Sequence, residues 1–348
     1  MKIKDESKPS NGSTKDSSVF ADMSYLIYSF LAKMIKTFFR RLIKGPRRKA
    51  WSWKLEMVIA LQSVSYHLLS KIGAIRYQKV LSKLLTKVQD GGARVELSKD
   101  KNVPGHWFIP PTDHGNVILY FHGGGYVYGS VHTHGNMIGE IACASSARIF
   151  VPDYCLAPEY PQPAAITDAC LAYEHLLNTG VHPNRIVLAG DSAGGGLVIS
   201  VLLTLRDSNK VLPAGAVCIS PWVNLECTEK SFDTNASYDP VTREACLVAA
   251  TAYLNGTDPR NPIVSPLFAN LQGLPPLLIH GGEVEVLHDQ IVEFALKAKS
   301  MRVNTTLKIY PDMVHVWHML TGFTIQAKEA ISEISEFIIK HAGTEKQT

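Results

Sequence analysis

The 348-residue sequence lacks the patterns that mark several classes of protein. Its six cysteines include no C-x-x-C pair, and no His, Cys and Asp cluster has metal-ligand spacing. It also has no phosphate-binding glycine loop, no internal repeat and no recognised nucleic-acid-binding module. These absences argue against a zinc protein and against a nucleic-acid partner. We therefore expect reduced core cysteines, no metal and no cofactor.

An uninterrupted apolar run of membrane-spanning length is missing as well. A span requires about 20 apolar residues, whereas Lys33 and Lys36 interrupt the most apolar stretch near the amino terminus. That stretch also begins late and lacks a clear small-residue cleavage site, so the sequence gives little support for a cleaved signal peptide.

The sequence does have enough apolar residues to form a large core, because 46% of its residues are hydrophobic. Apolar runs alternate with helix-length periodic segments. This alternation predicts an α/β fold with a mainly parallel central sheet and helices on both faces. Strands are expected near 93–97, 105–109, 117–121, 147–152, 185–190, 215–220, 276–281 and 306–310, and crossover helices near 134–146, 164–179, 193–207, 287–301 and 325–341.

The segment 190–194, Gly-Asp-Ser-Ala-Gly, directly follows a strand-like apolar run. A serine between such glycines, after a strand and before a helix, is typical of a nucleophile elbow. The short pattern alone would equally suit a structural turn. In this context we predict that Ser192 is a nucleophile, with Asp191 supporting the turn.

A second glycine-rich segment follows the apolar run 117–121 and reads His122, Gly123, Gly124, Gly125. Glycine N–H groups without neighbouring Cβ atoms can stabilise a developing oxyanion. We predict that these three glycines and the N–H of Ala193 form an oxyanion hole. His122 is expected to hold the loop rather than transfer protons, and a flexible turn is the alternative.

A serine nucleophile needs a general base, and several of the 13 histidines are candidates. We select His315 because it follows the strand-like run 306–309, which gives the chain order serine, acid, histidine. His318 is the main rival, and His280 lies at the end of another predicted strand.

The acid is expected after that other strand, where the segment 281–289 contains three carboxylates. One of them should orient the imidazole and stabilise its charged form. We rank Glu285 first and keep Asp289 as the substitute, since any single carboxylate is by default a solvated surface group.

Further segments make the chain resemble a known family. The stretch 153–161, Asp-Tyr-Cys-Leu-Ala-Pro-Glu-Tyr-Pro, is similar to the D-Y-R-L-A-P-E-x-P segment of the hormone-sensitive-lipase family of α/β-hydrolases. The short segments 265–267 and 274–276 also match the pattern of this family. The resemblance, over residues 95–340, is to the carboxylesterase and arylacetamide-deacetylase group. This chain differs from the family pattern at Glu285, where Asp is usual, and at Cys155, where Arg is usual.

The resemblance implies an α/β-hydrolase fold with a helical cap and a carboxylic ester hydrolase that forms an acyl-enzyme. It implies short- to medium-chain acyl esters, including acetyl esters of hydrophobic alcohols, as substrates. An amidase or formamidase on the same scaffold is one alternative. A small-molecule receptor is another, because plant gibberellin receptors resemble the same family but lack the catalytic histidine, which is present here.

The amino-terminal region differs from the rest of the sequence. We expect a disordered tail over 1–19, cap or amphipathic helices over 20–90, and a catalytic domain over 91–342, with 223–253 adding to the cap. Apolar residues recur at helical spacing over 26–42, and nine basic residues but no acidic residue lie between 33 and 54.

Such a basic amphipathic helix has three interpretations. It can pack as part of the cap, lie on an anionic membrane surface through residues 26–49, or act as a signal anchor. The corresponding locations are the cytoplasm, a membrane surface or the endoplasmic reticulum membrane. The sequence does not choose among them, and it leaves the oligomeric state open.

Overall fold

The structure, a computed structural model, describes residues 13–343 and contains one eight-stranded sheet. The strand order is β1-β2-β4-β3-β5-β6-β7-β8, and all neighbours from β4 to β8 run parallel, while β2 is antiparallel to both β1 and β4. The strands are β1 (Arg94–Leu97), β2 (Gly105–Ile109), β3 (Val117–Phe121), β4 (Arg148–Pro152), β5 (Ile186–Asp191), β6 (Gly215–Ile219), β7 (Leu277–Gly282) and β8 (Thr305–Tyr310).

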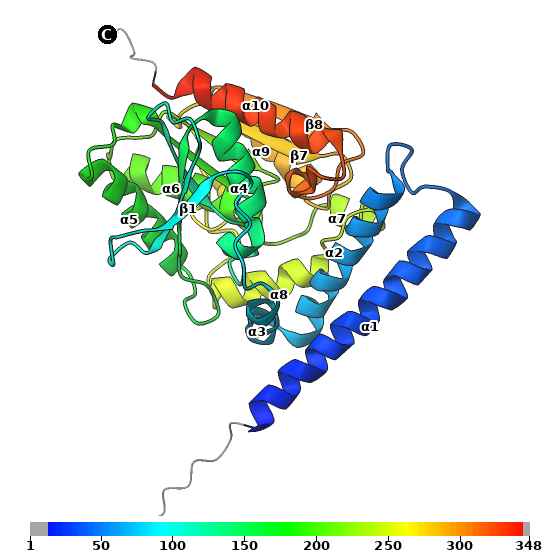
Figure 1. The fold of residues 1–348 in the computed structure, drawn as a ribbon. Coiled ribbons are helices and arrows are strands. Elements are labelled where there is room, and N and C mark those ends of the chain that lie inside the picture. The colour runs from blue at the N-terminus through cyan, green and yellow to red at the C-terminus, as the bar shows by residue number, and fades with distance from the viewer. Residues whose placement is uncertain (1–12, 344–348) are drawn as a thin grey trace, which may run out of the picture.

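Helices cover both faces of this sheet (Figure 1). The helices α4 (Val131–Ser145) and α10 (Ile325–His341) pack together on one face, and α5 (Ala164–Asn178), α6 (Ala193–Asp207) and α9 (His288–Ser300) pack on the other. Successive residues of β3 contribute to the two separate cores, because side chains alternate across a strand. The predicted fold class is confirmed.

The eight predicted strands and five predicted crossover helices are all present, with ends shifted by three residues at most. The central strands could be predicted from the sequence because β3, β5, β6 and β7 are buried on both faces and therefore consist of continuous apolar runs. Shorter elements complete the fold: α7 (Ser231–Thr234) and the 3₁₀ turns Pro183–Arg185, Pro266–Phe268 and Trp317–Leu320.

Four further helices gather at one side of the sheet (Figure 1). They are α1 (Ser13–Lys44), α2 (Trp53–Ile72), α3 (Ala74–Leu84) and α8 (Arg243–Leu254). Helix α2 is central, because it contacts α1, α3 and α8. Ser52 caps its first turn by accepting a hydrogen bond from the N–H of Leu55.

The start of α1 corrects one expectation. Residues 1–12 of the predicted disordered tail lie outside the described residues, but 13–19 belong to α1. Helix formation is cooperative, so a helix already formed by later residues extends readily into a polar segment that contains no proline or glycine.

Candidate active site

Ser192 lies at the sharp turn between β5 and α6 and has φ 53° and ψ −121°. The surrounding backbone leaves no room for side chains at the flanking glycines. A Cβ at Gly190 would lie 2.5 Å from the carbonyl oxygen of Gly194, and one at Gly194 would lie 2.0 Å from that of Phe121. The two glycines are therefore required for the turn that presents the serine hydroxyl.

His315 follows β8 and reaches Ser192 across the end of the sheet. Its Nε2 lies 2.9 Å from Ser192 Oγ, and its Nδ1 lies 3.0 Å from Glu285 Oε2. Burial lowers the pKa of His315, but the hydrogen bond and charge of Glu285, with the charge of Asp239, raise it above its ordinary value. The structure thus places a serine, a histidine and a carboxylate in one hydrogen-bonded series.

Glu285 is fully buried in the loop after β7. Its second oxygen, Oε1, accepts the N–H of Gly282 at 3.0 Å, which fixes the carboxylate beside His315. Asp289 points elsewhere, because its Oδ2 accepts the N–H of Ser231 at 2.9 Å. The glutamate therefore reaches the imidazole at the position where the family usually has aspartate.

The other two candidate histidines do not contact Ser192. His318 is buried, and its Nε2 lies 3.0 Å from Nδ1 of His280, which is also buried. Burial lowers the pKa of both imidazoles. They belong to the core behind His315.

A further carboxylate, Asp239, lies beside the same loops. Its Oδ2 accepts the N–H of Val286 at 2.5 Å, and its Oδ1 accepts the backbone N–H of His315 at 3.4 Å. Burial raises the pKa of Asp239 to about 7. Asp239 belongs to the segment 223–253, and its sequence neighbours give no sign that it ties the acid loop to the histidine loop.

The glycine-rich loop departs from our prediction at Gly123. Its N–H donates to Asp191 Oδ1 at 3.0 Å, so it is turned away from Ser192 and is not a free donor. The N–H groups of Gly124 and Gly125 have no acceptor among the described residues, and both glycines have positive φ. The N–H of Ala193 is one of the unpaired donors at the start of α6.

Asp191 is the centre of the network that shapes this loop. Its buried carboxylate also accepts the hydroxyl of Tyr120 at 2.8 Å and lies 3.2 Å from His134 Nε2. Burial would raise the pKa of Asp191, but the charge and hydrogen bond of His134 hold it below its usual range. Sequence reasoning missed His134, since nothing near it indicates a contact 57 residues away.

His122 is positioned by hydrogen bonds on the other side of the loop. Its Nδ1 donates to the carbonyl oxygen of Gly123 at 2.8 Å, and its own carbonyl oxygen accepts the hydroxyl of Tyr154 at 2.7 Å. Burial lowers the pKa of His122 to about 4, so the ring is neutral. It lies in the loop without contacting Ser192.

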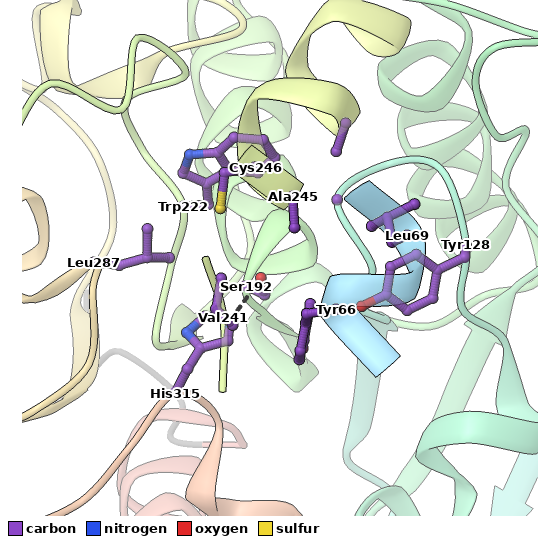
Figure 2. A pocket seen from close by; sticks show the side chains of 12 residues that line it. Tyr66, Leu69, Tyr128, Ser192, Trp222, Val241, Ala245, Cys246, Leu287 and His315 are labelled. Carbon is purple, nitrogen blue, oxygen red and sulfur yellow. Dashed lines mark hydrogen bonds between the residues drawn. The ribbon is translucent and has the colours of Figure 1, made fainter. Parts of the chain in front are cut away.

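A narrow cavity, partly open to solvent, lies against Ser192 and His315 (Figure 2). Tyr66 and Leu69 of α2 and Ala245 and Cys246 of α8 project into it, opposite the strand ends that carry the serine. Its remaining lining residues are Gly125, Tyr128, Trp222, Val241, Ala249 and Leu287. The cavity is narrow, aromatic and mainly apolar.

All six cysteines are free. Cys218, Cys227 and Cys246 are buried, and the other three, Cys143, Cys155 and Cys170, are half-buried. Within residues 13–343, no group of three or more His, Cys, Asp or Glu side chains has the arrangement of a metal site.

The comparisons with known proteins agree with this arrangement. Residues 118–319 match the model of a family with the alpha/beta hydrolase fold. An acetyl-hydrolase from Streptomyces hygroscopicus is 41% identical over 238 residues, which are 68% of this chain and 80% of that protein. Two solved esterases are similar as well. EstE5 has a TM-score of 0.73 and 41% identity over 80% of this chain and 98% of its own. An esterase of the bacterial hormone-sensitive lipase family has a TM-score of 0.72 and 36% identity over 93% and 99%.

The fold, the elbow and these similarities define a carboxylesterase-like serine hydrolase. More narrowly, the chain belongs to the hormone-sensitive-lipase family of α/β-hydrolases.

Proposed function

We propose that the protein hydrolyses carboxylic esters through an acyl-enzyme formed on Ser192, with His315 as general base and Glu285 as the orienting acid. The observation that supports this proposal is the unbroken series of hydrogen bonds from Ser192 Oγ to His315 Nε2 and from His315 Nδ1 to Glu285 Oε2. Such a series holds the imidazole in the tautomer that can accept the serine proton.

In the first half-reaction Ser192 Oγ attacks the ester carbonyl carbon while His315 Nε2 accepts the hydroxyl proton. Glu285 stabilises the resulting imidazolium, and the N–H groups of Gly124, Gly125 and Ala193 stabilise the oxyanion. The carbon–oxygen bond to the alcohol then breaks, and the alcohol leaves with the proton from His315. Water, deprotonated by His315, then attacks the acyl carbon. The bond between this carbon and Ser192 Oγ breaks, His315 returns the proton to Oγ, and the carboxylic acid is released.

The width and the apolar lining of the cavity beside Ser192 indicate which acyl groups it can hold. A narrow apolar space favours acyl groups of short to medium length, with acetyl at the short end. Helices α2 and α8 supply much of its lining, and we propose that α1–α3 and the segment 223–253 together form the cap. The similar esterase EstE5 was soaked with p-nitrophenyl butyrate, which carries a four-carbon acyl group.

The test is hydrolysis of p-nitrophenyl esters with two to twelve acyl carbons by the purified chain and by Ser192→Ala. We expect turnover with an optimum at short chains, and a loss of about 10⁶-fold in the variant. Unchanged turnover in Ser192→Ala would refute the proposed nucleophile. Matched amide substrates separate an esterase from an amidase, because the same residues would serve both reactions.

A further inference from the structure

Helix α1 presents its charged side to the protein. Arg40 and Arg41 both pair with the carboxylate of Glu56 in α2, which is only 1% exposed, and Arg47 lies 3.8 Å from it. Nearer its start, α1 carries buried Asp22, which pairs with Arg76 of α3 at 2.6 Å. These ion pairs fix the orientation of α1 on α2 and α3, since a buried carboxylate must keep its partners.

The opposite side of α1 is apolar and largely exposed, and α1 itself is the outermost of the four helices beside the sheet (Figure 1). We call it the outer apolar face. Its large side chains are exposed by 39% to 63%, in contrast to Leu26 on the inner side, which is 4% exposed. They are Ile27, Leu31, Met34, Ile35, Phe38, Phe39 and Leu42, and the ring of Trp53 in α2 stacks on that of Phe38. A contiguous exposed apolar surface of this kind marks a contact with a partner or with lipid.

The charge around this face is strongly one-sided. Residues 23–89 contain 14 Lys and Arg but a single acidic residue, the buried Glu56, so this region carries a net charge of +13. The whole chain carries +4, which leaves −9 for all other residues. Four lysines near this face are exposed: Lys36 and Lys44 of α1, Lys49 of the connecting segment, and Lys54 of α2.

We propose that the outer apolar face of α1 docks on an anionic lipid bilayer. The apolar side chains enter the boundary between headgroups and acyl chains, and the lysines contact anionic headgroups. A second copy of the chain does not fit as the occupant, because a symmetric contact through α1 would bring two strongly basic regions together. The charge complementarity thus favours lipid over self-association.

The expected geometry is a helix lying in the plane of the interface. At 32 residues, α1 is about 48 Å long. Among the described helices, none is both long and apolar enough to traverse a bilayer. Since its polar side is held by α2 and α3, α1 offers the bilayer one face only, and α2 connects that face to the cavity beside Ser192.

The experiment is flotation of the full chain with vesicles of phosphatidylcholine alone or of phosphatidylcholine with 30% phosphatidylglycerol. The test variant carries Ile35→Ser, Phe39→Ser and Leu42→Ser, all on the outer apolar face. The matched control carries Leu97→Ser, Leu296→Ser and Ile339→Ser, whose side chains are similarly exposed on β1, α9 and α10. Hydrolysis of a water-soluble ester and far-UV circular dichroism confirm that each variant is folded.

We expect the wild-type chain and the control to float with anionic vesicles, and the test variant to lose at least about tenfold in partition coefficient. Lys36→Glu should lower anionic binding by at least about fivefold, and added salt should weaken it. Equal flotation of the test and control variants would overturn the proposal, as would absence of wild-type flotation. A dimer by light scattering that only the test variant dissociates would instead assign the face to a second copy.

Discussion

Two buried histidine–carboxylate pairs lie beside the same serine, and their surroundings differ. In the pair His315–Glu285, the second ring nitrogen lies 2.9 Å from Ser192 Oγ. In the pair His134–Asp191, the second ring nitrogen lies 2.6 Å from the hydroxyl of Thr133. Both pairs raise the pKa of a histidine against the effect of burial. Under the proposed mechanism, the group that faces the second nitrogen, rather than the pair itself, decides whether a pair transfers a proton or supports a loop.

Replacing the two histidines should separate these roles most strongly. We expect His315→Gln to lower kcat by at least about 10⁴-fold, because the serine loses its base. His134→Gln should cost no more than about tenfold, since glutamine can still donate to Asp191 and preserve the loop. Steady-state kinetics on one p-nitrophenyl ester gives both values, and equal losses would contradict the distinction.

Glu285→Gln should have the next largest effect, a loss of about 10³- to 10⁴-fold in kcat, because an amide no longer stabilises the imidazolium and permits the wrong tautomer. Asp289→Asn is the matched control, since its carboxylate accepts the backbone N–H of Ser231 and does not contact His315. The idea fails if the two variants retain similar kcat values.

Asp191→Asn should act on stability as well as on rate. It breaks a buried pair, so we expect a loss of about 3–5 kcal/mol in the free energy of unfolding. The loop that holds Gly124 and Gly125 depends on the same carboxylate, so kcat should fall by about ten- to a hundredfold. Urea unfolding and kinetics measure both, and a variant as stable as wild type would refute this account of the network.

The smallest expected effect is a shift in pH dependence. His315 must be neutral to act as base, and its pKa lies above the ordinary 6.5. Activity should therefore be full above the raised pKa and fall as the pH drops through it. Glu285→Gln should move this acidic limb to lower pH, Asp239→Asn should move it less, and His134→Gln should leave it in place. If His134→Gln moves the acidic limb as far as Glu285→Gln does, the limb does not report the titration of His315.

Much of this arrangement could be predicted from the sequence because it depends on local patterns. Buried parallel strands consist of continuous apolar residues, and the elbow, the glycine-rich loop and the His315 segment each follow such a strand. Since parallel strands end at the same edge of a sheet, their loops had to meet there. The segment 281–289 also follows such a strand, and of its carboxylates Glu285, which we ranked above Asp289, is the one that lies 3.0 Å from His315 Nδ1.

The remainder depends on contacts between distant residues. The HGGG pattern does not reveal that the N–H of Gly123 turns toward Asp191, 68 residues later. Helical periodicity predicts that α1 has an apolar face and a basic face, but it does not predict which of them packs against the rest of the protein. The buried carboxylate of Glu56, 15 residues beyond Arg41, pairs with this arginine and holds the basic face against α2. The sequence alone therefore favoured cap packing without excluding membrane contact.

The backbone of Ser192 also limits how stable this enzyme can become. A non-glycine residue at φ 53° and ψ −121° costs on the order of 1–3 kcal/mol, which the surrounding packing must offset. Glycine at position 192 would relieve that strain, so Ser192→Gly should melt at a higher temperature than Ser192→Ala, although neither has a nucleophile. The position of the proposed nucleophile thus holds a destabilising residue at the centre of the fold, and additional thermal stability has to come from elsewhere in the chain.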